Sequence, residues 1–221
     1  MPDERDPPSP RLNGSPLNGA GGHHDEADEP EPAASPPREL PPPPVAVAEL
    51  CAAAIRFVGS RYKVALDGTP DTLSLLDQYV RDAREAVKER PESVDLVGPS
   101  IGAYLGEVMR QAFGAEWWSE GAHEGWRLYF TNVYLAFNPL GMGREAVTMT
   151  DEPGWQAHLT LDPGDREAIE ERIGAMPDVD EEEYYLPTTR LDVVTAVVET
   201  LRARAEASGT GDVTFTRDDY G

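Results

Sequence analysis

Three stretches in the first half of the chain place apolar residues at the three- and four-residue spacing of an amphipathic helix. They cover residues 45–62, 69–90 and 96–113. In the second, Thr69 can cap the helix, Pro70 suits its first position and Pro91 ends it. Asp77 and Arg84 fall mostly on the polar side of this stretch. The pattern therefore predicts three N-terminal helices, each with one buried face.

The third stretch carries a glycine at every fourth position, as Gly98, Gly102 and Gly106. These positions share one face of a helix, and a glycine inside a helix costs about 1 kcal/mol relative to alanine. A helix retains glycines mainly where another segment approaches its backbone closely. We therefore expect a central helix that is crossed tightly on this face. Because Pro99 removes a helical hydrogen bond, we expect the main helix to start near it, with residues 93–97 as a separate turn.

From residue 126 onward the pattern changes to the alternation of half-buried strands, rich in aromatic and β-branched residues. The predicted strands are residues 126–131, 133–138, 146–150 and 155–161. Short turns between them favour an antiparallel meander. Two further helices are predicted, from Asp162 as cap to Ala175, and from Thr188 or Thr189 to about Ala207. The expected fold class is α+β, with the three N-terminal helices packed on an antiparallel sheet of three to five strands and two C-terminal helices.

Composition divides the chain into three parts. Residues 1–44 are dominated by proline, glycine, serine and acids, so we expect a disordered, Pro-rich acidic tail. Residues 45–207 have the composition of a single globular domain. Residues 208–221 have the composition of a polar C-terminal tail, in which residues 213–215 could add a short edge strand.

The formal net charge of −22 narrows the range of partners. Nucleic acid and anionic membranes are bound through clustered Lys and Arg, and the sequence has no such cluster, so we expect neither partner. A basic protein partner is electrostatically allowed. Cys51 is the single cysteine, so no disulfide can form within the chain, and no signal peptide or membrane-spanning stretch is visible. We expect a soluble, cytoplasmic protein.

Glu107 and His158 are the candidate catalytic residues. Glu107 lies among apolar neighbours, and a desolvated glutamate can act as a general acid or base. We favour the alternative, a carboxylate paired with an arginine or a backbone amide, because no second catalytic group stands at a fixed spacing. His158 is predicted mid-strand, where a histidine without an orienting acid is more often structural. A hydrolase or transferase would need Glu107, His158 and Glu116 in one cleft.

Trp117 and Trp118 are adjacent in the connection that leads into the sheet. On an extended segment, neighbouring side chains point to opposite faces. One tryptophan is therefore expected to cover the core and the other to lie nearer the surface, where it could anchor a partner or a ligand. Together with Tyr129 and Tyr134, the two tryptophans could form the wall of a small-ligand site.

No sequence motif points to a metal ion or a cofactor, and we expect neither. His23 and His24 stand in the acidic tail, where we expect no preformed site. The acidic run at residues 178–183 lacks the glycine and the bidentate glutamate of an EF-hand, so we interpret it as a solvated loop. The Gly-Met-Gly at residues 141–143 lacks the flanking strand and helix of a dinucleotide-binding loop.

Three motifs stand close together in the middle of the chain: DTLSLLD at residues 71–77, GAYLGE at residues 102–107 and GAEW at residues 114–117. They resemble those of a group of bacterial α+β domains of unknown function. The resemblance covers about residues 66–147. It implies helices that precede an antiparallel sheet, and it implies no activity, catalytic residue or ligand.

The acidity, the α+β core and the lack of catalytic motifs favour a non-enzymatic protein-binding module, such as an adaptor, a regulatory protein or a toxin-neutralising protein. A hydrolase or transferase that uses Glu107 and His158 is the second hypothesis. A small-ligand-binding domain lined by tryptophan and tyrosine is the third.

Overall fold

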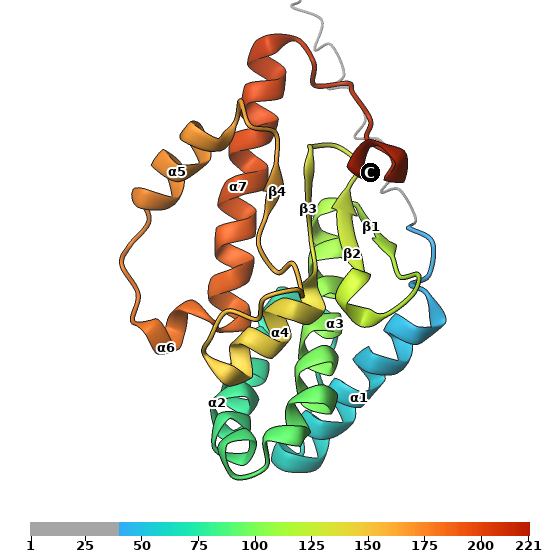
Figure 1. The fold of residues 1–221 in the computed structure, drawn as a ribbon, viewed down its shortest axis with the longest axis vertical. Helices are drawn as coiled ribbons and strands as arrows, with labels where there is room; N and C mark the ends of the chain where they lie inside the picture. The colour runs from blue at the N-terminus through green and yellow to red at the C-terminus, as the bar shows by residue number, and fades with distance from the viewer. Residues whose placement is uncertain (1–39) are drawn as a thin grey trace, which may run out of the picture. The chain divides into compact units, whose positions relative to one another are not determined.

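A small antiparallel sheet lies between helices from both halves of the chain (Figure 1). The computed structural model describes residues 40–221, and within this range it contains seven α-helices and one four-stranded sheet. The predicted α+β fold class is therefore confirmed. Most of the predicted N-terminal tail lies outside the described residues. Among the described residues, none of the helices combines the length and the apolar character needed to cross a membrane.

The three predicted N-terminal helices are confirmed. They are α1 (Val45–Tyr62), α2 (Leu73–Glu89) and α3 (Val94–Phe113). Short 3-10 turns that begin at Pro70 and at Pro91 lead into α2 and α3. The predicted start of the second helix is therefore corrected to Leu73, and the Thr69 side chain forms no capping hydrogen bond. The predicted start of the third helix near Pro99 is wrong, because α3 is continuous through Pro99. One missing hydrogen bond is tolerated here because the flanking Gly98 and Gly102 are packed tightly against another helix.

The sheet is an antiparallel meander, as predicted, in the order β1-β2-β3-β4. Its first strand was not predicted, because it forms in the stretch that was expected to be a loop leading into the sheet. Its strands are β1 (Ala115–Trp118), β2 (Arg127–Phe130), β3 (Leu135–Phe137) and β4 (Thr160–Leu161). All neighbouring pairs are antiparallel, with Ala115 opposite Phe130 and Leu128 opposite Phe137. The predicted strand at residues 155–161 is reduced to its last two residues.

The predicted strand at residues 146–150 is wrong. This part of the chain belongs to the helix α4 (Pro139–Thr148). Its start carries two strong signals, since the Asn138 side chain accepts a hydrogen bond from the Leu140 amide at 3.0 Å and Pro139 occupies the first turn. The β-branched residues near its end suggested a strand, but packing against α3 overrides that local preference.

The glycine face of α3 is crossed by α4, which confirms the expected close approach. A Cβ atom at Gly102 would overlap the Pro139 carbonyl oxygen and lie 2.5 Å from the Leu140 Cα atom. One at Gly98 would lie 2.9 Å from the Arg144 Cα atom. The relation is reciprocal, because a Cβ atom at Gly143 of α4 would overlap the backbone of Gly98 and Gly102. The two backbones therefore touch directly, with no side chain between them.

The C-terminal half contains α5 (Arg166–Gly174), the short α6 (Glu181–Tyr184) and α7 (Pro187–Ser208). The two predicted helices are present, but their starts are corrected. Helix α5 begins after the predicted cap Asp162, whose carboxylate instead accepts the Gly164 amide in a turn. In the acidic run interpreted as a loop, residues 178–180 are irregular and residues 181–183 belong to α6. Helix α7 begins at Pro187, before Thr188 and Thr189.

Asp77 and Arg84 of α2 are buried, although the sequence pattern placed them on the polar side. The Asp77 carboxylate accepts hydrogen bonds from the Thr188 amide at 3.1 Å and from the Thr188 hydroxyl at 2.5 Å. It thereby caps the first turn of α7 from another helix. Arg84 donates to the carbonyl oxygens of Ala146 in α4 at 2.9 Å and Glu182 in α6 at 2.8 Å. Two polar residues of α2 therefore tie three other helices together.

Residues 215–220 of the C-terminal segment lie against the sheet. The predicted edge strand at residues 213–215 does not form, although the Phe215 amide donates to the Thr131 carbonyl oxygen at 2.8 Å. The Tyr220 hydroxyl lies 2.8 Å from the Phe130 carbonyl oxygen and accepts a hydrogen bond from the Leu135 amide at 3.1 Å. The segment that has the composition of a polar tail is therefore fixed to the sheet, and the Tyr220 hydroxyl bridges β2 and β3.

Candidate functional site

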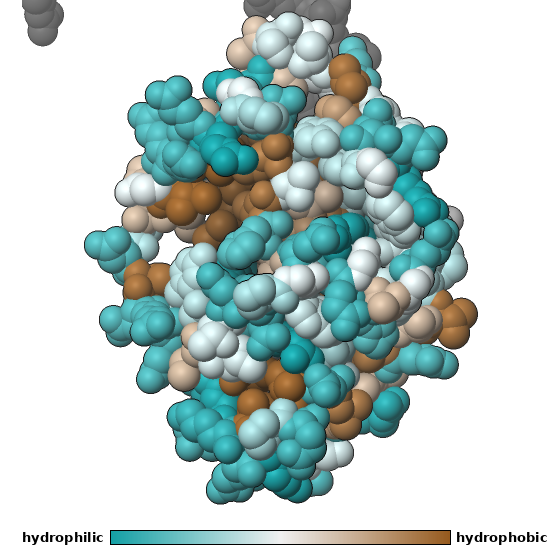
Figure 2. All heavy atoms as spheres, in the orientation of Figure 1, coloured by the Kyte–Doolittle hydropathy of each residue, from teal (hydrophilic) through white to brown (hydrophobic). Residues whose placement is uncertain are grey.

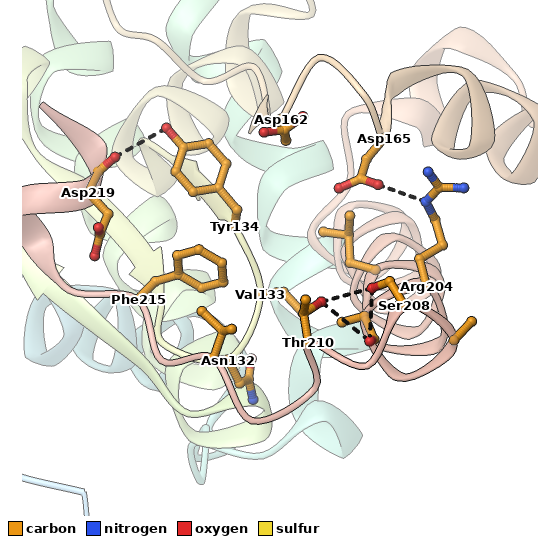
Figure 3. Close-up of a pocket in the computed structure, with 14 residues that line it drawn as sticks. Asn132, Val133, Tyr134, Asp162, Asp165, Arg204, Ser208, Thr210, Phe215 and Asp219 are labelled. Atoms are coloured by element: carbon orange, nitrogen blue, oxygen red, sulfur yellow. Dashed lines mark hydrogen bonds and ion pairs between the residues drawn. The ribbon is translucent and has the colours of Figure 1, made fainter.

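A cleft of about 760 Å³ opens between the C-terminal end of α7, the turn before β3, the turn between β4 and α5, and residues 210–219 (Figure 3). Its size lies in the range of ligand sites. The lining residues fall into an aromatic and aliphatic wall, a group of carboxylates, and a set of neutral polar side chains. Four chain segments thus supply the site.

The aromatic wall consists of Tyr134 and Phe215, whose rings meet edge to face with centroids 5.6 Å apart. Tyr134 also stacks on Tyr220, at 4.8 Å and an interplanar angle of 8°. Its hydroxyl donates to the Asp219 carbonyl oxygen at 3.3 Å (Figure 3). The wall is therefore held in place from the sheet side and from the C-terminal segment.

Three aspartates and one arginine give the cleft an excess of negative charge. Arg204 donates from Nε to Asp165 at 2.7 Å, which neutralises that carboxylate (Figure 3). Asp219 accepts hydrogen bonds from the Thr216 amide and hydroxyl, and these hold the pKa of its carboxyl group below the usual value. Asp162 accepts from the Gly164 amide at 2.7 Å. Among the residues that the structure describes, Asp162 and Asp219 therefore have no basic partner in the cleft.

The neutral polar side chains offer hydrogen-bond acceptors. The Asn132 amide group donates to the Phe113 carbonyl oxygen at 3.1 Å, while its Oδ1 atom is buried and accepts no hydrogen bond within residues 40–221. The hydroxyls of Ser208 and Thr210 lie 2.8 Å apart (Figure 3). The exposed Ser208 and Thr210 hydroxyls can accept hydrogen bonds, so this wall suits a ligand that brings N–H groups.

Of the four aromatic residues proposed from the sequence as a binding wall, Tyr134 lines the cleft. Trp117 donates from its indole nitrogen to Glu107 at 2.6 Å and lies against Gly106. Trp118 lies below the guanidinium group of Arg217, 4.2 Å from the ring centroid.

Tyr129 donates to the Glu116 carboxylate at 2.8 Å, and burial followed by this hydrogen bond raises the pKa of Tyr129 to about 12. The structure thus gives Tyr129, Trp117 and Trp118 partners within the fold.

Glu107 pairs with an arginine, which is the alternative that the sequence favoured. Its two carboxylate oxygens accept from Nε and Nη2 of Arg110 at 2.8 and 3.1 Å, and Trp117 donates to the first of them. Arg110 donates its remaining nitrogen to the Pro41 carbonyl oxygen at 3.0 Å, ahead of α1. Both oxygens of this buried carboxylate are therefore engaged in holding α3, β1 and the chain before α1 together.

His158 is exposed and lies in an irregular segment before β4 instead of within a strand. Its near neighbours are Glu145 and Asp151, and one ligand-type atom of each of the three residues lies within 4.8 Å of the others. Glu107, with Arg110 and Trp117 as partners, belongs to a different cluster. The hydrogen bonds of Glu107 and of Glu116 thus join neither residue to His158.

Most residues that line the cleft were not selected from the sequence, among them Asp162, Asp165, Arg204, Phe215 and Asp219. Asp162 was interpreted as a helix cap, and the last residues were interpreted as a tail. The one visible signal that the C-terminal segment belongs to the fold was the presence of Phe215 and Tyr220 among mostly polar residues. Aromatic residues are seldom retained in a solvated tail.

The resemblance of residues 66–147 to uncharacterised bacterial domains stays a prediction. Comparisons with protein-family models, with curated proteins and with solved structures gave no match to the chain.

Proposed function

We propose that this protein is a non-enzymatic recognition module that binds a basic segment of a partner protein, with a lysine or arginine side chain of the partner seated in the cleft. The observation that carries the proposal is the combination of unpaired carboxylates with an aromatic wall. Asp162 and Asp219 supply the charge, and Tyr134 and Phe215 supply apolar ring surface.

A cationic side chain matches each part of the cleft. Its charged end interacts favourably with the carboxylates and with an aromatic face, and a cation over an aromatic ring is worth about 0.5–2 kcal/mol. Its N–H groups can donate to the exposed hydroxyls of Ser208 and Thr210. Its alkyl stem can lie along aliphatic residues of α7, such as Leu201 and Ala205. The strong negative charge of the whole chain also speeds the approach of a basic partner.

The surroundings of the cleft favour a protein over a small molecule. Hydrophilic side chains cover most of the face in Figure 2, but apolar residues gather in a patch between α5 and β4. The turn at residues 162–165 that joins these two elements lines the cleft, so the patch adjoins it. An apolar patch next to a charged pocket gives a larger partner area to bury.

A small organic cation is the second candidate, because a cleft of about 760 Å³ could enclose it. This alternative retains the ligand-binding hypothesis for Tyr134, with a different set of neighbours.

The test is a titration of the full chain with a short lysine-rich peptide and with the same peptide in acetylated form, followed by calorimetry. We expect binding of the first peptide, loss of binding on acetylation, and weaker binding at high salt. In Asp162→Asn the side chain can still accept the Gly164 amide, so the turn is retained and only the charge is lost. We expect this variant to bind about two- to fivefold more weakly.

Asp178→Asn is the matched control, because it removes the same charge from an exposed residue that does not line the cleft. Equal weakening by both substitutions, or equal binding of the acetylated peptide, would contradict the proposal. Competition by n-butylammonium at the affinity of the peptide would instead favour the small-ligand alternative.

A further inference from the structure

Outside the cleft, three side chains of metal-ligating type converge from three parts of the chain. Glu145 belongs to α4, Asp151 to the loop after it, and His158 to the segment before β4. One oxygen or nitrogen atom of each lies within 4.8 Å of the others. Within residues 40–221 no hydrogen bond joins the His158 ring to either carboxylate. The His158 ring therefore lies close to the two carboxylates without a hydrogen bond to either of them.

The loop that carries Asp151 and His158 is anchored to α4. Trp155 packs on Gly141, where an added Cβ atom would lie 2.9 Å from the Trp155 Cβ atom, and the Arg144 guanidinium lies 4.5 Å from the Trp155 ring centroid. The backbone amide of Asn138, the residue before α4, donates a hydrogen bond to the Gln156 carbonyl oxygen at 3.0 Å. Residues 155–156 of the loop therefore return to α4 at a fixed place, while residues 149–151 follow directly from its end.

Glu145 has one oxygen available to a further partner. The residue is 2% exposed, and its Oε2 atom accepts from Arg190 at 3.0 Å. The contact made by Oε1 is a marginal one, 3.5 Å from the Glu152 amide. Arg190 itself is fixed by the faces of Tyr184 and Tyr185, so its pairing with Oε2 can persist when Oε1 takes another ligand. A buried carboxylate oxygen with so weak a partner calls for a cation or a donor.

We propose that Glu145, Asp151 and His158 bind a divalent transition-metal ion of the zinc type, which ties the loop at residues 149–159 to α4. Two ligands on one such ion, each at about 2.0–2.2 Å, lie at most about 4.4 Å apart, so small side-chain rotations close the cluster. An imidazole with two carboxylates is a donor set for zinc, manganese or iron, whereas magnesium and calcium prefer oxygen alone. Because Asp151 and His158 are exposed, an ion has direct access from solvent.

The test uses the full chain with the substitutions His23→Ala and His24→Ala, which remove the pair of consecutive histidines in the N-terminal sequence. Titration with ZnCl₂, followed by calorimetry and by thermal unfolding, is expected to give one bound ion per chain and a raised Tm, and MgCl₂ is expected to give neither. Adding His158→Ala or Asp151→Asn should weaken Zn²⁺ binding by more than about tenfold and abolish the rise in Tm. Both residues are exposed, so folding should be retained, which circular dichroism checks.

His123→Ala is the matched control, since His123 packs on Trp126 and lies outside the cluster. It should leave the Zn²⁺ affinity unchanged. Absence of stoichiometric Zn²⁺ binding, or the same affinity after His158→Ala, would overturn the proposal.

Discussion

The crossing of α3 and α4 and the cleft beside α7 are built on opposite principles. At the crossing, Gly102 and Gly143 bring two backbones together and leave no room for a methyl group. At the cleft, four segments meet around a space of about 760 Å³, and hydrogen bonds from side chains such as Tyr220 and Arg204 hold them. Close packing fixes the first region, while the second keeps surface and charge free for a partner.

Helix α7 joins the two regions. The Asp77 carboxylate of α2 caps the first turn of α7, and α2 also packs on α4. The last turns of α7 form one wall of the cleft. A partner bound in the cleft therefore contacts an element whose other end is fixed in the helical core. The contrast between the regions can be tested by substitutions that act on one of them alone.

The largest effect is expected from Gly102→Leu. The new side chain would overlap the Pro139 carbonyl oxygen and the Leu140 backbone, which cannot move without separating α3 from α4. We expect a loss of more than about 3 kcal/mol in the free energy of unfolding, measured by urea denaturation. Gly174→Leu is the control, since an added Cβ atom at Gly174 meets nothing within 4 Å, and its stability should stay near that of the wild type. Similar stability of both variants would disprove the close-packing argument.

A smaller loss is expected from Asp77→Ala. This substitution leaves the Thr188 amide and hydroxyl at the start of α7 without their acceptor, at a cost of about 1–3 kcal/mol in the free energy of unfolding. Asp77→Asn keeps one acceptor oxygen and should lose less. Thermal denaturation of the three proteins at one pH gives the comparison, and an unchanged Tm in Asp77→Ala would refute the capping role.

A local effect is expected from Tyr220→Phe. The hydroxyl that binds the Phe130 carbonyl oxygen and the Leu135 amide is removed, while the ring that stacks on Tyr134 is kept. We expect faster hydrogen exchange in residues 209–221, by about five- to tenfold for a lost hydrogen bond of about 1–1.5 kcal/mol. Exchange at the α3–α4 crossing should stay the same. Equal acceleration in both regions would mean that the cleft is not held separately.

The smallest effect is expected at Cys51 in α1, because its alkylation is measured on the unsubstituted protein. Burial, with a smaller contribution from Glu107, raises the pKa of the Cys51 thiol to about 12. Because the thiolate is the reactive form, alkylation at pH 8 should be roughly a thousandfold slower than in the urea-unfolded chain. The rate should rise about tenfold for each pH unit below the pKa. Rapid alkylation at pH 8 would show that this thiol is open to solvent.

The same thiol sets a direction for stability. Its pKa is higher in the folded chain than the ordinary value of 9.0, so the unfolded chain loses the proton first as the pH rises. The contribution of Cys51 to stability is complete below pH 9.0 and declines between that pH and about 12.

The fold was predictable wherever local signals and tertiary packing agree. The helices that follow Pro44, Pro70 and Pro91 and the aromatic strands β2 and β3 were identified in this way. Helix α4 was not, because its two glycines and β-branched residues suggest a loop and a strand until the crossing with α3 is known. Likewise, Asp77 and Arg84 look solvated on a helical wheel, because their partners come from segments far along the chain.

Less of the candidate site was predictable. Tyr134 was selected from the sequence, but the carboxylates of the cleft come from a turn and a C-terminal segment whose positions depend on the fold. The grouping of Glu145, Asp151 and His158 also depends on how one loop returns to α4, and their spacing matches no metal-binding motif. In contrast, the arginine pairing of Glu107 is a local contact, three residues apart on one helix, which sequence spacing can indicate.

The bond from Arg110 to the Pro41 carbonyl oxygen has a mechanical consequence. Tension applied to the chain ahead of α1 would reach the middle of the molecule through the Arg110 guanidinium group. Arg110 also donates a hydrogen bond to Glu107, and Glu107 accepts one from Trp117. A pull from that direction would load α3 and the first strand before it unwound α1.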